Sequence, residues 1–281
     1  MNQRKITAEG LLRFERYLRE EERSSGTIKK YIRDLDQLRE WLDGRPLNKT
    51  EIHSWKEKLL QEGFQPVTIN SKLAAVNRFL KMQGWEDLTV KTLKVQRKMF
   101  CEENRELTKQ EYERLVTTAQ GLGKERLALL METICATGIR VSELKYITVE
   151  AVNAGRTEIR LKGKIRVILL PGKLCRKLLK YAKRWKISSG SVFVSRTGKL
   201  LSRKQIWAEM KMLCDRAGVE QTKVFPHNLR HLFARCFYKI SHDLTKLADV
   251  LGHSNIETTR IYLISSGEEH VRTLDRLRLV T

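Results

Sequence analysis

Proline, cysteine and long apolar runs are scarce in this chain, and each scarcity argues against a class of protein. Four prolines in 281 residues argue against a Pro-rich disordered tail and favour helices. The five cysteines are widely spaced and contain no C-x-x-C pair, so we expect buried thiols in a reducing cytoplasm rather than a disulfide framework or a zinc knuckle. No run approaches the ~20 apolar residues of a membrane span, and the charged N-terminus lacks the apolar region of a secretory signal.

Acidic residues are also few relative to basic ones. The chain has 33 Asp and Glu but 55 Lys and Arg, which gives a formal net charge of +22 at pH 7. The excess is +7 in residues 1–100 and +15 in residues 101–281, so both parts of the chain are basic. A basic surface of this extent is typical of proteins that follow a polyanion. We expect DNA as the partner rather than RNA, because no run resembles an aromatic-studded RNA-binding strand.

The apolar spacing in residues 1–95 predicts four helices. The first helix follows Thr7, and Thr27 is the expected N-cap of the second. Thr50 is the expected N-cap of the third helix, and Pro66 opens the fourth. These residues are therefore predicted to form a small helical domain.

The fourth predicted helix has an inward apolar stripe formed by Ile69, Leu73, Val76 and Leu80. Lys72 and Arg78 fall off this stripe, so we expect both on the outer face. A basic stretch with few apolar anchors follows, and residues 96–105 are predicted to be an exposed linker. A second domain over residues 106–281 then begins with a helix at Thr108.

The second domain is predicted to be mostly helical. Two β-rich runs, 159–162 and 165–170, flank Gly163 and predict a hairpin. A weaker pair of strands is expected around residues 191–194 and the turn at 197–198. Few strands among many helices predict a mainly α fold with a small antiparallel β-sheet, not a doubly wound sheet.

The segment 225–231 places two imidazoles and a guanidinium at the start of a helix. At ~100° per residue, His227, Arg230 and His231 share one side. The opposite side is an apolar face formed by Leu229, Leu232, Phe233, Cys236, Phe237 and Ile240. Such a group at a helix N-terminus suits an anion, and the alternative is a solvated polar face. A zinc site on the two histidines is disfavoured, because the Glu of H-E-x-x-H is missing and Arg230 would repel a cation.

Two further segments place polar residues at helix ends. Gly252 fits the end of one helix, and Ser254 with Glu257 fits a capping box for the next, which holds His253 in the corner between them. Tyr262 would then lie about two turns along that second helix. In the run 136–144, an apolar helix stops at Gly138 and Arg140 stands at the junction with the next helix. Each segment alone is unspecific, since a plain helix–turn–helix with a core tyrosine gives a similar pattern.

Together these segments resemble the tyrosine recombinases, also called the phage integrase family. The family pattern is an Arg in T-G-x-R-x-S-E-L, a hairpin Lys, H-x-x-R, L-G-H, and a Tyr nine residues after that His. The matching residues are Arg140, Lys162, His227, Arg230, His253 and Tyr262. The resemblance covers essentially the whole chain: residues 1–95 resemble the family's SAM-like core-binding domain, and residues 106–281 its mixed α/β catalytic domain. We therefore expect no arm-binding domain in front of them, as in the compact Xer-like integrases.

The resemblance implies cleavage and rejoining of DNA through a 3′-phosphotyrosine intermediate, without metal, ATP or other cofactor. Arg140 and Arg230 would clamp the scissile phosphate by bidentate hydrogen bonds. His227 and His253 would donate to the same oxygens or relay protons, and Tyr262 would attack phosphorus.

The resemblance leaves the general acid less certain. Lys162 would protonate the departing 5′-oxygen, but the hairpin is shorter than the family's G-K-G-x-x-K form, so Lys164 is the alternative. Glu143 is expected to be a local hydrogen-bond acceptor and His231 a packing neighbour.

The resemblance also implies partners. We expect a clamp on duplex DNA with inverted-repeat core sites, and a location in the cytoplasm at the nucleoid of a bacterium. The free protein would be a monomer, and four protomers would assemble on two sites and exchange strands through a Holliday junction. Lys72, Arg78 and Lys164 are the expected DNA contacts. The segment after Tyr262, with apolar residues at helical spacing, would dock on a neighbouring protomer or on its own domain.

Two other functions stay open at this point. A type IB topoisomerase shares the nucleophile chemistry but relaxes supercoils without synapsis. A non-catalytic regulator would use residues 243–264 as a helix–turn–helix, yet it has no reason to carry Arg140, the H-x-x-R motif and Tyr262 together.

Overall fold

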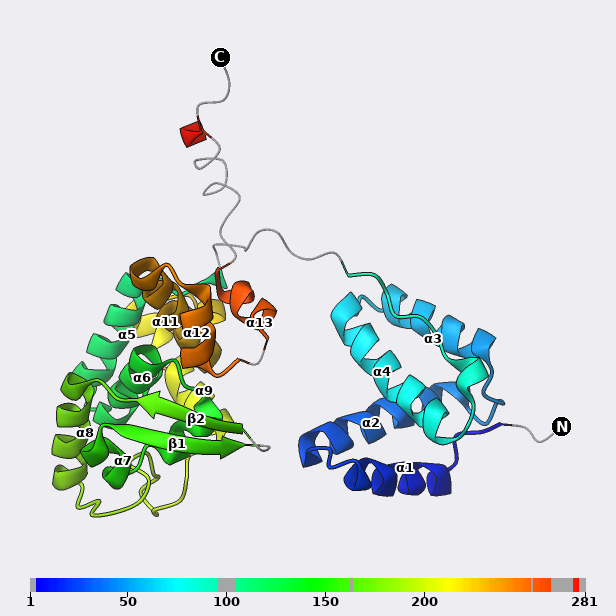
Figure 1. Cartoon of the computed structure of the whole chain (residues 1–281), viewed down its shortest axis with the longest axis horizontal. Helices are drawn as coiled ribbons and strands as arrows, with labels where there is room; N and C mark the ends of the chain where they lie inside the picture. The colour runs from blue at the N-terminus through cyan, green and yellow to red at the C-terminus, as the bar shows by residue number, and fades with distance from the viewer. Residues whose placement is uncertain (1–3, 96–104, 162–163, 254, 264–274, 278–281) are drawn as a thin grey trace. The chain divides into compact units, whose positions relative to one another are not determined.

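The computed structural model divides the chain into two compact units, Met1–Arg97 and Lys98–Thr281, and both are mainly helical (Figure 1). The structure describes residues 4–95, 105–161, 164–253, 255–263 and 275–277. Each unit has a hydrophobic core of its own. Among these residues, no helix combines the length and the apolarity that crossing a membrane requires.

The first unit contains the four predicted helices, α1 (Ala8–Glu20), α2 (Ser25–Leu42), α3 (Lys49–Gln61) and α4 (Pro66–Met82), and then the 3-10 helix η1 (Glu86–Leu88). The N-caps expected at Thr27 and Thr50 are wrong. Ser24 caps α2 by accepting from the Thr27 N–H, and Asn48 caps α3 by accepting from the Glu51 N–H. Both caps lie upstream of the predicted threonines, where the backbone is still extended and a short side chain reaches an unpaired N–H of the first turn.

A buried charge cluster joins α2 to α4. The predicted inward stripe of α4 is confirmed, but Lys72 is only 5% exposed, so its expected place on the outer face is wrong. Its ammonium donates to Gln37 Oε1 and lies 3.8 Å from the carboxylate of Asp34, which is itself 1% exposed. Burial lowers the pKa of Lys72, and the negative charge of Asp34 opposes that shift. Apolar periodicity could not reveal this side chain, because its partner lies on a different helix.

The second unit is helical around one hairpin, β1 (Arg156–Leu161) and β2 (Lys164–Leu169), which pair antiparallel as predicted. The weaker predicted pair forms only isolated bridges, Thr148–Ser191 and Val194–Leu200. Val192 and Phe193 are both buried, so this run lacks the alternation of a strand. The other elements are α5 (Lys109–Gly121), α6 (Glu125–Thr137), η3 (Val141–Tyr146), α7 (Val149–Ala154), α8 (Gly172–Arg184), α9 (Arg203–Lys211), α10 (Cys214–Ala217), η4 (Gln221–Lys223), α11 (Pro226–Ser241), α12 (Leu244–Leu251), α13 (Glu257–Arg260) and η5 (Ile261–Leu263).

Helix α11 lies between α6 and the pair formed by α12 and η5. Both of its faces are therefore covered near its start: Leu229 is buried on the expected apolar side, and Arg230, expected on a polar side, is 1% exposed. Near its end the helix is open, and Cys236 and Ile240 are exposed although the sequence places both on the apolar face. The neighbours of a helix, rather than its own periodicity, decide how much of each face is covered.

Gly138 ends α6 with a left-handed φ of +63°, and Gly155 ends α7 with a φ of +67°. A Cβ at Gly138 would lie 2.4 Å from the ring of Phe233, whereas a Cβ at Gly155 would meet nothing within 4 Å. We expect Gly155→Ala to cost about 1–2 kcal/mol for the left-handed backbone alone. Gly138→Ala should cost about 1–3 kcal/mol more, because Phe233 must move. Urea unfolding followed by circular dichroism measures the difference, and equal losses would contradict the close contact.

Candidate active site

Five of the six residues that match the family pattern lie at element ends of the second unit. They are Arg140 between α6 and η3, His227 and Arg230 near the start of α11, His253 just after α12, and Tyr262 in η5. Lys162 lies outside the described residues, and so does the side chain of Lys164. Helices α11, α12 and α13 pack in sequence order, which brings distant segments to one place (Figure 1).

Arg230 connects these segments through its guanidinium. Nη1 donates to the carbonyl of Gly138 at the end of α6, and Nη2 donates at 2.9 Å to the carbonyl of Leu251 at the end of α12. Such carbonyls have no partner within their own helices, so the guanidinium satisfies both. Nη2 also lies 2.8 Å from His253 Nε2, and Nε donates at 3.3 Å to the Tyr262 hydroxyl. Burial lowers the pKa of Arg230 to about 10, which leaves it protonated at neutral pH.

The contacts of His253 define its tautomer. A guanidinium can only donate, so Nε2 of His253 accepts from Arg230. The ring proton is therefore on Nδ1, which lies 2.8 Å from the hydroxyl of the fully buried Thr259 and donates to it. His253 thus stands in the corner between α12 and α13, as the sequence predicts, with a lone pair directed at Arg230.

Tyr262 is surrounded by aromatic rings and is 6% exposed. Its ring centroid lies 4.4 Å from that of His231, 5.7 Å from that of His227 and 5.6 Å from that of His253, with which it stacks. Tyr262 was expected two turns along a regular helix. Instead, α13 has only four residues and Tyr262 follows it in the 3-10 turn η5.

The capping box expected of Ser254 and Glu257 at the start of α13 stays a prediction. The helix begins at Glu257, whose N–H donates to Asn255 Oδ1 at 2.9 Å, and Ser254 lies outside the described residues. A four-residue helix is too short for the recognition helix of a helix–turn–helix, which lies along a major groove.

All three imidazoles around Tyr262 have lowered pKa values. Burial lowers the pKa of His231 to about 3 and that of His253 to about 4, and the positive charge of Arg230 contributes in both cases. The pKa of His227 is lowered by burial and then by Arg230 and Arg140. The three rings are therefore neutral at pH 7, and the guanidiniums carry the positive charge of the site.

Arg140 is held in place by Glu143. Its backbone N–H donates to Glu143 Oε2 at 2.8 Å, and its Nη1 donates to Oε1 at 3.0 Å. Glu143 is 1% exposed, while the side chain of Arg140 keeps 44% of its surface exposed. Arg140 also lies close enough to Arg230 and His227 to lower the pKa of both. The predicted role of Glu143 as a hydrogen-bond acceptor is confirmed, and Arg140 retains donors for a further ligand.

Arg166 belongs to the same cluster, and the sequence analysis missed it. Its Nη1 donates to Glu143 Oε2 at 2.9 Å, and its Nη2 donates to the carbonyl of Val250 at 2.7 Å. The signal that could have found it is the alternation of β2: Val167 is half exposed, whereas Ile168 is buried and Arg166 shares its face. A charged residue on the covered face of a strand needs a buried partner.

The residues expected to contact DNA in the first unit are engaged within it. Lys72 is buried against Asp34, and Arg78 is paired with Glu21 and lies over the ring of Tyr17. Neither side chain therefore presents a free charge in this arrangement.

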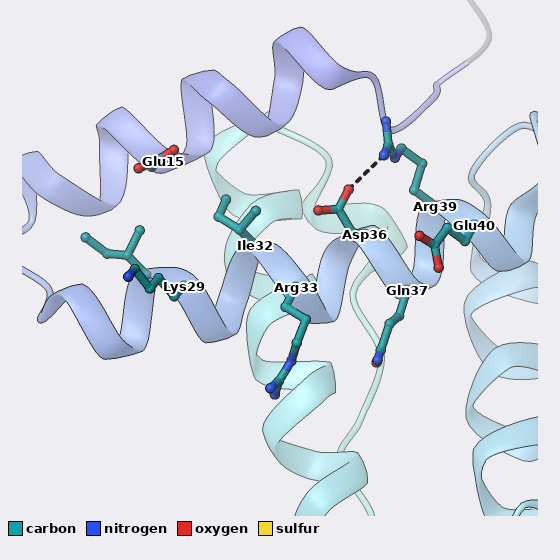
Figure 2. Close-up of a pocket in the computed structure, with 9 residues that line it drawn as sticks. Glu15, Lys29, Ile32, Arg33, Asp36, Gln37, Arg39 and Glu40 are labelled. Atoms are coloured by element: carbon teal, nitrogen blue, oxygen red, sulfur yellow. Dashed lines mark ion pairs between the residues drawn. The ribbon is translucent and has the colours of Figure 1, made fainter. Parts of the chain in front are cut away.

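A hollow of about 580 Å³ also lies in the first unit, beside α2. It is lined by charges of both signs, and Asp36 and Arg39 pair across 2.9 Å, whereas Arg33 and Gln37 point away from this pair (Figure 2). The hollow contains none of the residues of the family pattern. Within the described part of the chain, no three His, Cys, Asp or Glu side chains gather as metal ligands.

Comparisons with known proteins agree with this arrangement. The model of the phage integrase family matches residues 105–269, and that of the phage integrase N-terminal SAM-like domain matches residues 11–87. Tyrosine recombinase XerA of Thermococcus kodakarensis is 29% identical, over 95% of this chain and 94% of its own length. The fold resembles that of a lambda integrase dimer bound to a COC′ core site, with a TM-score of 0.71 and 17% identity over 92% of this chain and 78% of that one. It also resembles XerH site-specific recombinase bound to its difH substrate, with a TM-score of 0.68 and 19% identity over 84% and 76%. The chain is therefore a member of the phage integrase family, with the catalytic and the SAM-like domains of that family.

Proposed function

We propose that this chain is a site-specific DNA recombinase that cleaves and rejoins duplex DNA through a 3′-phosphotyrosine intermediate. The observation that carries the proposal is the environment of Tyr262. Its hydroxyl accepts from Nε of the buried Arg230, and three neutral imidazoles surround its ring. A structural tyrosine does not require a buried guanidinium at its hydroxyl, whereas a nucleophile directed at a phosphate does.

The donors of Arg230 support phosphate binding at this place. Nε and Nη2 face the Tyr262 hydroxyl and His253. A phosphate can replace the phenol and the imidazole as acceptor from these two neighbouring donors, because guanidinium and phosphate match in bidentate geometry. Arg140, partly exposed and held by Glu143, would donate to the same phosphate from the surface. Both cations would stabilise the charge that develops on the non-bridging oxygens.

The proposed reaction transfers the phosphoryl group without external energy. The Tyr262 oxygen bonds to phosphorus, and the bond between phosphorus and the 5′-oxygen breaks. The phenolic proton passes to a neutral imidazole, His227 or His253, which the lowered pKa values keep unprotonated at pH 7. Lys162, with Lys164 as the alternative, gives a proton to the departing 5′-oxygen. The reverse sequence with a 5′-hydroxyl of another strand rejoins the DNA and frees Tyr262.

Domain organisation and partners are part of the same proposal. Residues 1–95 and 106–281, joined by the linker 96–105, would hold duplex DNA, in keeping with the net charge of +22. Structures similar to this one include a lambda integrase tetramer bound to a Holliday junction and a lambda integrase dimer bound to a core site. We infer four protomers on two inverted-repeat sites. The segment after Tyr262, most of which lies outside the described residues, would dock on a neighbouring protomer or on its own domain.

The test is capture of the covalent intermediate. The protein is incubated with a pool of nicked duplexes of randomised sequence, so that a short 5′-hydroxyl fragment diffuses away after cleavage. An adduct that resists SDS and forms equally with and without EDTA is expected. Sequencing the captured DNA then identifies the cleaved sequence, the captured site. No adduct would argue for a non-catalytic regulator. Adduct formation that EDTA abolishes would contradict the metal-free mechanism.

The type IB topoisomerase is the second candidate, and the captured site separates the two functions. A recombinase should join strands of two different duplexes only when both carry that site. Relaxation of supercoiled plasmids without the site, and no joining between duplexes, would favour the topoisomerase.

A further inference from the structure

Arg166 connects three segments of the second unit that are far apart in sequence. It extends from β2, binds Glu143 of η3 through Nη1, and binds the carbonyl of Val250 in α12 through Nη2. Glu143 uses both oxygens for Arg140, so one carboxylate holds two guanidiniums. The hairpin, the Arg140 junction and the end of α12 are therefore linked through one side chain.

The side chain of Arg166 also packs closely against Gly252. A Cβ at Gly252 would lie 2.4 Å from Arg166 Cδ and 2.9 Å from its Nε. Gly252 has a φ of +65° and directly precedes His253. The stem of Arg166 thus lies on the turn that carries His253, where another residue would force the two segments apart.

The burial of Arg166 costs folding free energy that an ion pair on the surface does not cost. Its side chain is only 11% exposed, burial lowers its pKa, and no described group accepts from its buried Nε. The Glu143 carboxylate opposes this shift, and the positive charge of Arg140 nearby adds to it. A buried ion pair with a second cation beside it and an unpaired donor is weak evidence of a stabilising role, so the position of Arg166 calls for another explanation.

We propose that Arg166 is a positioning residue of DNA cleavage, which fixes the phosphate-binding Arg140 in relation to the turn of His253. Arg166 does not touch the reacting atoms. It donates to Glu143 Oε2, the oxygen that also accepts from the Arg140 backbone N–H, and it holds the turn through Val250 and Gly252. Both groups then meet the scissile phosphate at a fixed separation. The inference rests on the proposed function and deepens it.

The alternative is that Arg166 affects cleavage through the hairpin. Arg166 lies in the same strand as Lys164, so it could act by placing the lysine that protonates the leaving 5′-oxygen. The two routes differ in chemistry. Phosphate binding is needed whatever the leaving group, whereas a leaving thiolate needs no proton because its pKa is far below that of an alcohol. A duplex with sulfur in place of the bridging 5′-oxygen therefore separates them.

The experiment compares single-turnover cleavage of the oxygen and the sulfur duplex, both with the captured site. Arg166→Gln should cleave both about 10²-fold more slowly than the unmodified protein, the loss typical of misplaced catalytic groups, with unchanged binding of uncleaved DNA. Lys162→Ala should be slow with oxygen and restored with sulfur. Arg156→Gln, which removes an exposed arginine from the same hairpin, is the matched control and should cleave both at the normal rate. Arg166→Lys should be intermediate, because one ammonium cannot bind Glu143 and Val250 as a fork does.

Each outcome decides between the routes. If sulfur restores Arg166→Gln, the residue acts through the hairpin and the proposal is overturned. Normal cleavage of both duplexes by Arg166→Gln also overturns it. If Arg166→Gln does not fold, Arg166→Lys and Gly252→Ala are measured instead. Both variants should cleave the sulfur duplex as slowly as the oxygen duplex. Normal cleavage rates in both variants would overturn the proposal. Failure of the proposed function is distinguishable, since the unmodified protein would then form no adduct at all.

Coupling to Glu143 gives an independent readout. If Arg166 acts through Glu143, Glu143→Gln and Arg166→Gln together should slow cleavage about as much as the more severe single variant. Multiplied losses in the double variant would show that the two residues act separately and would overturn the positioning role.

Discussion

Tyr262→Phe is expected to eliminate the covalent protein–DNA adduct and to leave binding of the captured duplex unchanged. The substitution removes the one oxygen of this side chain that can bond to phosphorus. The ring keeps its contacts with His227, His231 and His253, so folding should lose only about 1–3 kcal/mol, because the buried Nε of Arg230 is left without its acceptor. Electrophoresis in SDS measures the adduct, and a gel shift measures binding.

Tyr181 provides the control for this prediction. It lies in α8, its 5% exposure matches the 6% of Tyr262, and burial raises the pKa of its hydroxyl. Tyr181→Phe should form the adduct at the normal rate. An adduct in Tyr262→Phe would place the nucleophile elsewhere, and loss of the adduct in Tyr181→Phe would show that cleavage depends on buried hydroxyls in general.

Arg230→Lys is expected to slow cleavage by at least ~10²–10³-fold, the usual loss when one donor to a developing oxyanion is removed. A lysine keeps a charge but loses the fork that Nε and Nη2 form toward Tyr262 and His253. It cannot also reach the carbonyls of Gly138 and Leu251, which Arg230 binds through Nη1 and Nη2. Leaving buried carbonyls unpaired should lower the free energy of unfolding by about 2–4 kcal/mol. Single-turnover cleavage and urea unfolding measure the two effects.

Arg235 is the matched control, since it lies in the same helix and also donates to a backbone carbonyl, although its side chain is 27% exposed. It donates to Glu106 and, at 2.6 Å, to the carbonyl of Leu107, and none of these groups belongs to the cluster around Tyr262. Arg235→Lys should lose some stability and cleave DNA at the normal rate once folded. Equal cleavage losses in Arg235→Lys and Arg230→Lys would mean that the effect at position 230 comes from the folding of α11 alone.

Local rules predicted most elements of the fold from the sequence. Pro66 and Pro226 open α4 and α11, Thr108 caps α5, and Gly138 and Gly252 end α6 and α12, because each of these signals acts within one turn of the chain. Errors arose where two nearby residues offered the same cap, as Ser24 and Thr27 did. A choice between such residues depends on a difference in backbone conformation that composition does not contain.

Long-range partners could not be predicted in the same way. Apolar periodicity places Lys72 on the solvent-facing side of α4, but its ammonium is buried beside Asp34 of α2. Arg166 has no motif of its own, and its importance is visible only beside Glu143 and Gly252. In both cases the energy that fixes the side chain comes from a charge on another element, which a local pattern cannot register.

The sequence by itself determined the chemistry of this protein. It specifies which side chains are present at Arg140, His227, Arg230, His253 and Tyr262, and their order and spacing identify the family. Only the tertiary structure decided the burial, the protonation and the hydrogen bonds of these side chains. Packing α11 between α6 and α12 buries the Arg230 guanidinium, lowers the pKa values of the imidazoles, and brings the Tyr262 hydroxyl to Nε of Arg230. Burial and charge proximity depend on distances between segments far apart along the chain, and those distances exist only once the domain has folded.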